Sequence, residues 1–221
     1  MNVNCLLGHM LNVISPAECA SCGENAPIYP FPVCSICVSS IISSGSPEKI
    51  TSDITQKIYS CLEYTPAVKC CLKSFKFEGN KKLAAFFRKI IVSQLLSEEL
   101  RKERYDVILP VPLHRSRKRK RGYNQSEILA EMISNSLGVP LRPDILIKIR
   151  NTPPQSGLRK TERKKNLKGS FSVTGKAFLA SKSVLVVDDV ITTGATIEEC
   201  AATILNAGAG TVSAFTLARV I

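Results

Sequence analysis

Residues 184–196 constrain the fold of this chain more than any other segment. An apolar, β-branched run leads into two adjacent acids, Asp188 and Asp189, and then into a Thr-Thr-Gly-Ala-Thr turn ahead of a predicted helix. Such a run is typical of a buried strand. Further buried strands are predicted at residues 107–112 and 211–216, and further helical spacing occurs at residues 126–137 and 196–206. This succession of strands, loops and helices predicts an α/β protein, with a parallel sheet flanked by helices.

The turn after the two acids also predicts a chemistry. Carboxylates at the end of a strand can accept hydrogen bonds from a pair of vicinal hydroxyls. The turn and the helix N-terminus can hold a phosphate through Thr192, Thr193, Gly194, Ala195 and Thr196. These features together predict a site for a ribose 5-phosphate. The alternative is a plain strand–turn–helix, in which two unpaired acids would be costly without a ligand.

The charge of the chain is concentrated in one block. The formal net charge is +12, and residues 101–168 hold 18 basic and 6 acidic residues, which accounts for the whole excess. A localised basic field predicts an anionic partner, whether nucleic acid, phosphorylated metabolite or lipid head group.

Two segments of this block are candidates for contact with an anion. Residues 115–121 are basic at six of seven positions, and residues 150–171 have the composition of a long, polar loop of the kind that often has a function. The alternatives are a solvated face and an exposed linker. The residues predicted to contact pyrophosphate or nucleic acid are Arg115, Arg117, Arg119, Arg121, Gln125, Arg159 and Arg163.

Four of the nine cysteines have the spacing of a metal site. They form two Cys-x-x-Cys pairs separated by eleven residues: Cys19, Cys22, Cys34 and Cys37. Four thiolates can complete a tetrahedral shell around a structural Zn²⁺, whereas the alternative is four reduced, buried cysteines. The later cysteines lack ligand spacing and are predicted to be core or surface thiols. They are Cys61, Cys70, Cys71 and Cys200.

The N-terminal residues do not predict export or a membrane span. No apolar run reaches the about 18–20 residues that a spanning helix needs. The first residues lack the basic region of a signal peptide, and residues 6–14 instead predict a short amphipathic helix. A cytoplasmic protein is therefore expected.

Residues 184–196 resemble the phosphoribosyl pyrophosphate (PRPP) signature of type I phosphoribosyltransferases. Other motifs are Pro-Val-Pro-Leu, Arg-Gly-Tyr-Asn-Gln, Thr-x-x-Gln-x-x-Leu and Asn-x-x-Gly-x-Phe, and residues 73–83 look like a Lys-Phe-x-Gly element. Behind the cysteine pairs, this set resembles the ComF family of competence-associated, phosphoribosyltransferase-like proteins, also called the ComF/GntX group.

The resemblance implies a type I phosphoribosyltransferase fold with an N-terminal zinc ribbon built on the four cysteines. It divides the chain into a zinc-ribbon module at residues 1–45, a helical connecting or hood segment at 46–100 and a phosphoribosyltransferase-like domain at 101–221. In that family Asp188 and Asp189 would bind the ribose 2- and 3-hydroxyls.

Three functions follow from the resemblance. The first is a PRPP-binding protein that handles single-stranded DNA in the bacterial cytoplasm during natural transformation, with a DNA-uptake helicase as a further partner. The second is a metabolic phosphoribosyltransferase that acts on a small nitrogenous acceptor and uses Mg²⁺ with PRPP. Asp188 and Asp189 would be its catalytic residues, and His114 is a candidate general base. The third is a protein that only binds PRPP, as a sensor or scaffold.

Overall fold

The computed structural model describes residues 18–24, 31–45, 48–50, 54–77, 82–95, 102–152 and 165–221. Several predictions lie outside these residues: the helix at 6–14, most of the polar loop predicted within 150–171, and the side chains of Arg159 and Arg163. The strands are β1 (Glu48–Ile50), β2 (Ile58–Glu63), β3 (Val107–Pro110), β4 (Leu146–Lys148), β5 (Phe171–Val173), β6 (Ser183–Ile191) and β7 (Thr211–Arg219). The helices are α2 (Ser35–Ser43), α3 (Pro66–Phe77), α4 (Lys82–Leu95), α6 (Arg115–Arg121), α7 (Gln125–Leu137), α9 (Lys176–Leu179) and α10 (Ala195–Leu205).

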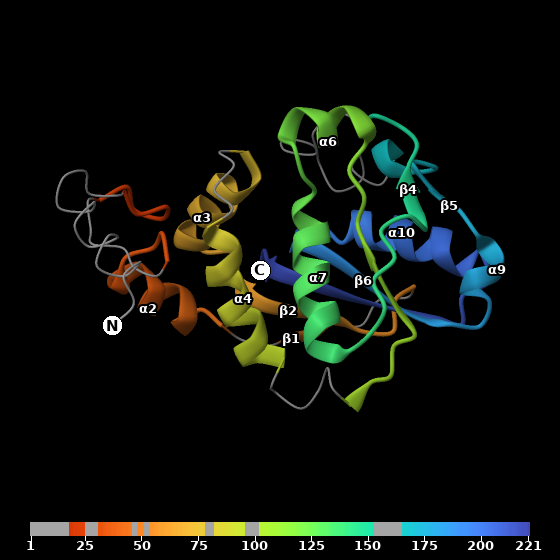
Figure 1. Ribbon diagram of the computed structural model, residues 1–221, viewed down its shortest axis with the longest axis horizontal. Helices are drawn as coiled ribbons and strands as arrows, with labels where there is room; N and C mark the ends of the chain where they lie inside the picture. The colour runs from red at the N-terminus through yellow and green to blue at the C-terminus, as the bar shows by residue number, and fades with distance from the viewer. Residues whose placement is uncertain are drawn as a thin grey trace, which may run out of the picture.

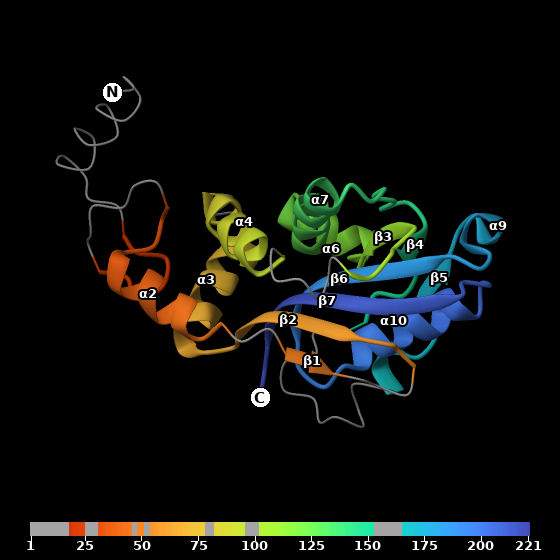
Figure 2. The same cartoon turned by 90° about the horizontal axis from the view of Figure 1, so that it is seen from below.

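A five-stranded sheet in the order β1-β2-β7-β6-β3 forms the centre of the described chain (Figure 1). Strands β2, β7, β6 and β3 are parallel, and β1 pairs with β2 in the antiparallel direction. Helices α4 and α7 cover one face of the sheet and α10 covers the other (Figure 2). Because both faces are covered, the inner strands β6 and β7 are apolar and buried along most of their length.

The predicted helix at residues 126–137 corresponds to α7, which begins and ends at recognisable caps. The side chain of Asn124 accepts a hydrogen bond from the backbone N–H of Ser126, and Gly138 closes the helix in the left-handed conformation. An N-cap asparagine and a left-handed glycine satisfy backbone groups that the helix leaves without partners. This cap fixes the start of α7 beside the end of β3, because the Asn124 amide also donates to the carbonyl of Val111.

Helices α3 and α4 make up most of the described part of the predicted helical segment, but this segment also contains a strand that the sequence did not predict. Residues 58–63 form β2, which joins β7 in the central sheet. The hydroxyl groups of Ser60 and Thr216, 2.7 Å apart, form a buried hydrogen bond between these strands. A six-residue run with mixed polarity does not distinguish a strand from a helix, and its partner lies more than 150 positions away in the sequence.

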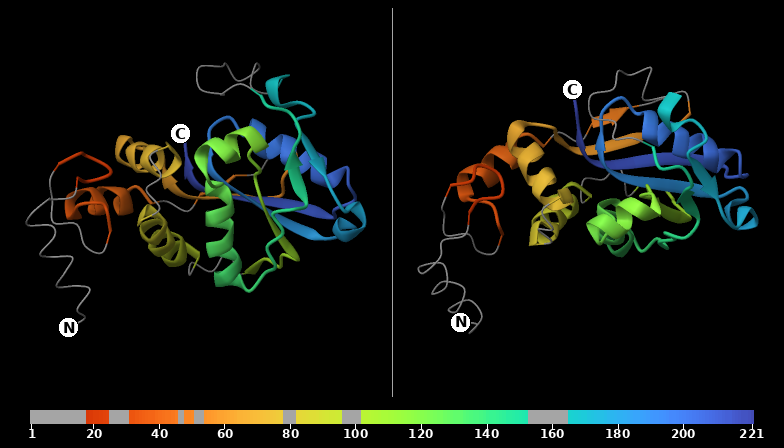
Figure 3. Two further views of the ribbon diagram at one scale, coloured as in Figure 1. Left: turned by 45° about the horizontal axis from the view of Figure 1, so that its top comes forward. Right: turned by 90° about the horizontal axis from the view of Figure 1, so that it is seen from above.

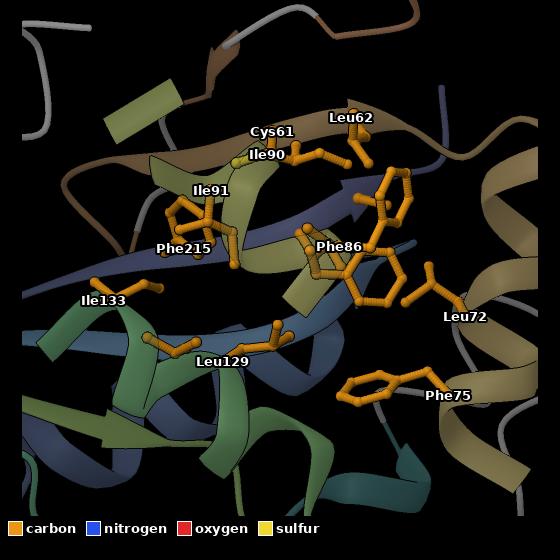
Figure 4. Close-up of a cluster of buried hydrophobic side chains, with 14 of the residues drawn as sticks. Cys61, Leu62, Leu72, Phe75, Phe86, Ile90, Ile91, Leu129, Ile133 and Phe215 are labelled. Carbon is orange, nitrogen blue, oxygen red and sulfur yellow. The ribbon is translucent and has the colours of Figure 1, made fainter. Parts of the chain in front are cut away.

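One hydrophobic core joins the sheet to α3, α4 and α7 (Figure 4). Phe75 on α3 and Phe87 on α4 meet edge to face, with ring centroids 5.4 Å apart. The same core includes Cys19, Val33 and Ile41 from the N-terminal part of the chain. The segment that contains the cysteine pairs therefore packs at the α3 end of the molecule, away from α9 (Figure 3).

Candidate functional site

The turn between β6 and α10 brings most of the predicted phosphate-binding residues together. A hollow of about 20 Å³ is lined by Asp188 and by the turn residues Thr192, Thr193, Gly194, Ala195 and Thr196, together with their apolar neighbours. Gly194 directly precedes α10 and has a φ of 79°, a conformation that strains any residue with a Cβ. The hollow thus lies at the N-terminus of an eleven-residue helix, where backbone N–H groups and the helix dipole favour an anion.

Asp188 is buried and held by two hydrogen bonds. Its Oδ1 accepts from the hydroxyl of Ser126, 2.8 Å away on α7, and from the backbone N–H of Asp189 at 2.9 Å. Burial and the charge of Asp189 raise the pKa of Asp188 to about 7, while Lys76 and the Ser126 hydrogen bond lower it. The carboxyl group therefore changes its charge close to neutral pH, and its two hydrogen bonds orient it.

Asp189 has a different environment from its neighbour. Lys76 on α3 forms an ion pair with it, with 2.8 Å between Nζ and Oδ1. The second oxygen, Oδ2, is buried and has no hydrogen-bond partner among the described residues. Asp189 does not belong to the lining of the hollow that Asp188 shares with the turn. The structure thus places one acid against the turn at residues 192–196 and the other against α3.

The basic run at residues 115–121 is the helix α6, and its charges point in two directions. His114 caps its N-terminus by accepting from the backbone N–H of Ser116, and Gly122 ends it in the left-handed conformation. Arg117 donates to the carbonyl of Thr152, and Arg121 donates to the side chain of Gln125. The exposed residues are Arg115, Lys118, Arg119 and Lys120. Hence only part of the predicted anion-binding set faces solvent.

A larger groove opens beside α6. Its volume is about 510 Å³, and it lies between α6, the start of α7 and β4. The apolar part of its lining includes Leu113 and Ile147, and the charged part includes Arg115, Lys118 and Lys148. Glu127 also lines it and forms an ion pair with Lys118 at 2.8 Å. Basic groups therefore outnumber acidic ones along this groove.

The two cysteine pairs come together as their spacing predicts. The sulfur atoms of Cys19, Cys22, Cys34 and Cys37 lie within 4.8 Å of one another, a cluster that could hold a metal ion. The backbone N–H of Cys34 donates to the sulfur of Cys19 at 3.3 Å, a contact that favours a thiolate. The later cysteines behave as expected for core and surface thiols, with Cys61, Cys71 and Cys200 buried and Cys70 exposed.

The fold and these motifs agree with the known proteins that the chain resembles. A model of the phosphoribosyl transferase domain matches residues 123–220. Competence protein ComFC of Bacillus subtilis is 32% identical over 72% of this chain and 63% of that protein, and competence protein F of Haemophilus influenzae is 36% identical over 52% and 50%. The DNA utilization protein YhgH of Salmonella typhimurium is 30% identical over 75% of this chain and 73% of its own length. The chain belongs to the ComF family.

This ComF-family chain has the type I phosphoribosyltransferase fold, a parallel sheet with helices on both faces and a cysteine cluster near its N-terminus. Within the described ranges, no helix is both long enough and apolar enough to cross a membrane.

Sequence reasoning missed two residues that contact the acids, Ser126 and Lys76. Ser126 lies in the first turn of α7, 62 positions from Asp188, and only the packing of α7 on β6 brings them together. Lys76 is the lysine of the Lys-Phe-x-Gly element. The family resemblance identified this element but gave it no role. No local pattern reports such contacts, because each joins two elements that are distant in the sequence.

The raised pKa of Asp188 predicts how stability changes with pH. In the folded protein Asp188 keeps its proton up to about pH 7, whereas in the unfolded chain it releases the proton above about pH 4. The stability that the folded state gains from the neutral carboxyl group is therefore fully present at low pH and is lost as pH rises toward about 7. Asp188→Asn keeps the neutral form at every pH. We expect the melting temperature of the wild type, relative to that of this variant, to fall between pH 5 and pH 7 and to level off above about pH 7, by roughly 2–4 °C for each kcal/mol of stability lost.

The control is Asp144→Asn, because the exposed Asp144 is hydrogen-bonded to Arg142 and has a lowered pKa, outside this pH window. Circular dichroism melts at pH 5, 6, 7 and 8 would measure all three proteins. Parallel curves for the wild type and Asp188→Asn would contradict the assignment.

Proposed function

We propose that this protein binds PRPP at the end of β6 and single-stranded DNA on the surface of α6, and that it acts in the bacterial cytoplasm during DNA uptake. The observation that carries the proposal is the hollow that Asp188 shares with the turn from Thr192 to Thr196. It combines a carboxylate, three threonines and the N-terminus of α10 at one strand end. That set of groups suits a sugar joined to a phosphate.

The roles of the groups follow from their chemistry. The turn and the N-terminus of α10 would hold the 5-phosphate, and Asp188 and Asp189 would accept hydrogen bonds from the ribose hydroxyls. Arg121, which is half-buried and interacts electrostatically with Asp189, would offset negative charge that a pyrophosphate brings to the site. Carboxylate oxygens are ligands that suit Mg²⁺, which would neutralise part of the charge of the pyrophosphate.

The DNA-binding part rests on the solvent-facing side of α6. Arg115, Lys118, Arg119 and Lys120 are exposed, and two of them line the groove beside β4. Among the described residues, no phenylalanine or tyrosine lines that groove, so contacts with phosphates rather than base stacking would dominate. Weak sequence preference is therefore expected. The names of the relatives, which refer to competence and DNA utilization, support this choice of anion.

We further propose that the cysteine cluster binds a structural Zn²⁺. Four sulfur atoms within 4.8 Å of one another fit a closed tetrahedral shell, which leaves no position for a substrate. The cluster also shares the core of α3 and α4 through Cys19. The ion would therefore stabilise the N-terminal part of the chain.

The zinc proposal predicts that Cys34→Ser lowers the melting temperature and the zinc content. Removing one of four thiolates weakens metal binding, and metal binding contributes folding free energy. The matched control is Cys70→Ser, since Cys70 is exposed and lies outside the cluster. Elemental analysis and thermal melts would be recorded with and without a chelator. One zinc per chain in wild type and in Cys70→Ser is the expected result, and zinc-free wild type would refute the proposal.

The PRPP proposal predicts that Asp189→Ala weakens PRPP binding by about 10- to 100-fold, because a hydrogen bond to a charged group contributes roughly 1.5–3 kcal/mol. Isothermal calorimetry with PRPP and Mg²⁺ would measure the dissociation constants. Asp144→Ala removes an equal charge at an exposed position and is the control. If Asp189 did not contact the ligand, loss of its negative charge near a polyanion should strengthen binding. An affinity that is unchanged or improved would therefore show that Asp189 does not bind PRPP.

The DNA proposal predicts a salt dependence that can be traced to α6. The combined variant Lys118→Gln, Arg119→Gln and Lys120→Gln should reduce the slope of log K against log salt by up to about 2, since each phosphate contact contributes roughly 0.7 for single strands. A variant with Lys69, Lys73 and Lys176 changed to Gln removes the same charge from other exposed positions. Fluorescence anisotropy of a labelled single-stranded oligonucleotide gives the slopes. Equal slopes in both variants would contradict the proposal, because they would mean that DNA binds away from α6 or is attracted only by the overall positive charge.

A further inference from the structure

The last turn of α3 reaches the acid pair from outside the phosphoribosyltransferase-like region. Lys76 lies one residue before the end of this helix, and its Nζ is 2.8 Å from Oδ1 of Asp189. The side chain of Lys76 is 21% exposed and that of Asp189 is 6% exposed. This is a partly buried ion pair, so it is screened less than a pair on the surface.

Two further contacts hold this turn against the site. The hydroxyl of Tyr123 donates to the carbonyl of Phe75, and the guanidinium of Arg121 lies over the ring of Phe77, 4.8 Å from its centroid. Arg121 is the last residue of α6, and Tyr123 lies in the segment that joins α6 to α7. The neighbours of Lys76 on both sides, Phe75 and Phe77, are therefore held by contacts. These contacts fix the backbone from which the Lys76 side chain extends to Asp189.

The hydrogen bonds of Asp189 suggest what the ion pair does. Lys76 occupies Oδ1, whereas Oδ2 is buried without a partner among the described residues. A buried carboxylate oxygen that lacks a hydrogen bond is unfavourable, and a hydroxyl donor would relieve this. Because Oδ2 is covered, the carboxylate has to turn to meet a ligand. The flexible stem of a lysine allows the ammonium group to follow it.

The charges around the acid pair come from several elements. The cationic groups are Lys76 on α3, Arg121 on α6 and Lys148 on β4, and the neutral ones are Ser126 on α7 and Cys200 on α10. The charge of Lys76 lowers the pKa of Asp188, against the burial and the Asp189 charge that raise it. Removing Lys76 leaves two adjacent carboxyl groups with less compensation, which favours a proton on one of them.

We propose that Lys76 is a positioning residue of the sugar site, which orients Asp189 through Oδ1 and leaves the other carboxylate oxygen to accept from a hydroxyl of the ligand. The proposal rests on the proposed binding of PRPP at this site. Lys76 acts through the two acids, and it links α3 to the sugar rather than to the phosphate turn. Its effect is therefore expected in the pH dependence of binding as well as in the affinity.

The test compares wild type with Lys76→Met, Lys76→Arg and the control Lys73→Met, which removes an exposed lysine from the same helix. Calorimetry with PRPP and Mg²⁺, and separately with ribose 5-phosphate, is carried out from pH 6 to pH 9. In Lys76→Met we expect affinity for both ligands to fall about tenfold at pH 7 and the midpoint of the pH profile to rise by about one pH unit, which corresponds to that tenfold loss. Lys76→Arg should restore the wild-type profile, and Lys73→Met should retain it.

A Lys76→Met profile that parallels that of the wild type would overturn the proposal, because a purely structural role lowers affinity equally at every pH. Folding is checked by thermal melts, and Lys76→Gln replaces Lys76→Met if the latter does not fold. Carbon NMR titration of the Asp188 carboxyl group needs no ligand. A higher pKa of Asp188 in the variant supports the role of Lys76, and an unchanged pKa counts against it. If the wild type binds neither ligand, that failure of binding refutes the proposed function, and the pKa comparison still tests the effect of Lys76 on the acid pair.

Discussion

The structure depends on the way in which two adjacent acids are held at the end of a buried strand. Asp188 and Asp189 are both buried, and an unpaired charge in such a place costs several kcal/mol. The chain offsets this with partners from two separate elements, the hydroxyl of Ser126 on α7 and the ammonium group of Lys76 on α3. The acids can therefore remain at the strand end only if both helices are packed where the structure has them.

This requirement connects distant parts of the molecule. Helix α3 packs through Phe75 into the core that includes α4 and α7, and the cysteine segment joins the same core through Cys19, Val33 and Ile41. The hydroxyl of Ser21, between the first pair of cysteines, also contacts the carbonyl of Ala67 on α3 at 3.4 Å. A metal ion in the cysteine cluster would thus support the helix that supplies Lys76, without any contact between the ion and the site.

Helix α6 separates two uses of positive charge. Arg117 and Arg121 are turned toward Thr152 and Gln125 within the fold, whereas Arg115, Lys118, Arg119 and Lys120 are exposed. A single seven-residue helix can do this because successive side chains point in directions about 100° apart. Of the inward cations, Arg121 interacts electrostatically with Asp189, and the outward ones form a basic surface that faces solvent.

Much of this could be predicted from local sequence. Several features depend on spacing within a short window, where residue type and backbone preference decide the outcome. They are the strands β3, β6 and β7, the helices α7 and α10, the turn at residues 192–196 and the cysteine cluster. Glycine at position 194 is an example, since the turn needs a positive φ there. The family motifs placed these pieces on one fold.

Only the tertiary structure decided the rest. It made residues 58–63 a strand through pairing with β7, it made residues 115–121 a helix with two faces, and it brought Ser126 and Lys76 to the acids. Each of these outcomes depends on contacts between residues far apart in the chain, and a buried charge or hydroxyl takes whichever partner the packing supplies. The sequence by itself determined which groups are present at the end of β6, and the packing of α3 and α7 determined their hydrogen-bond and ion-pair partners.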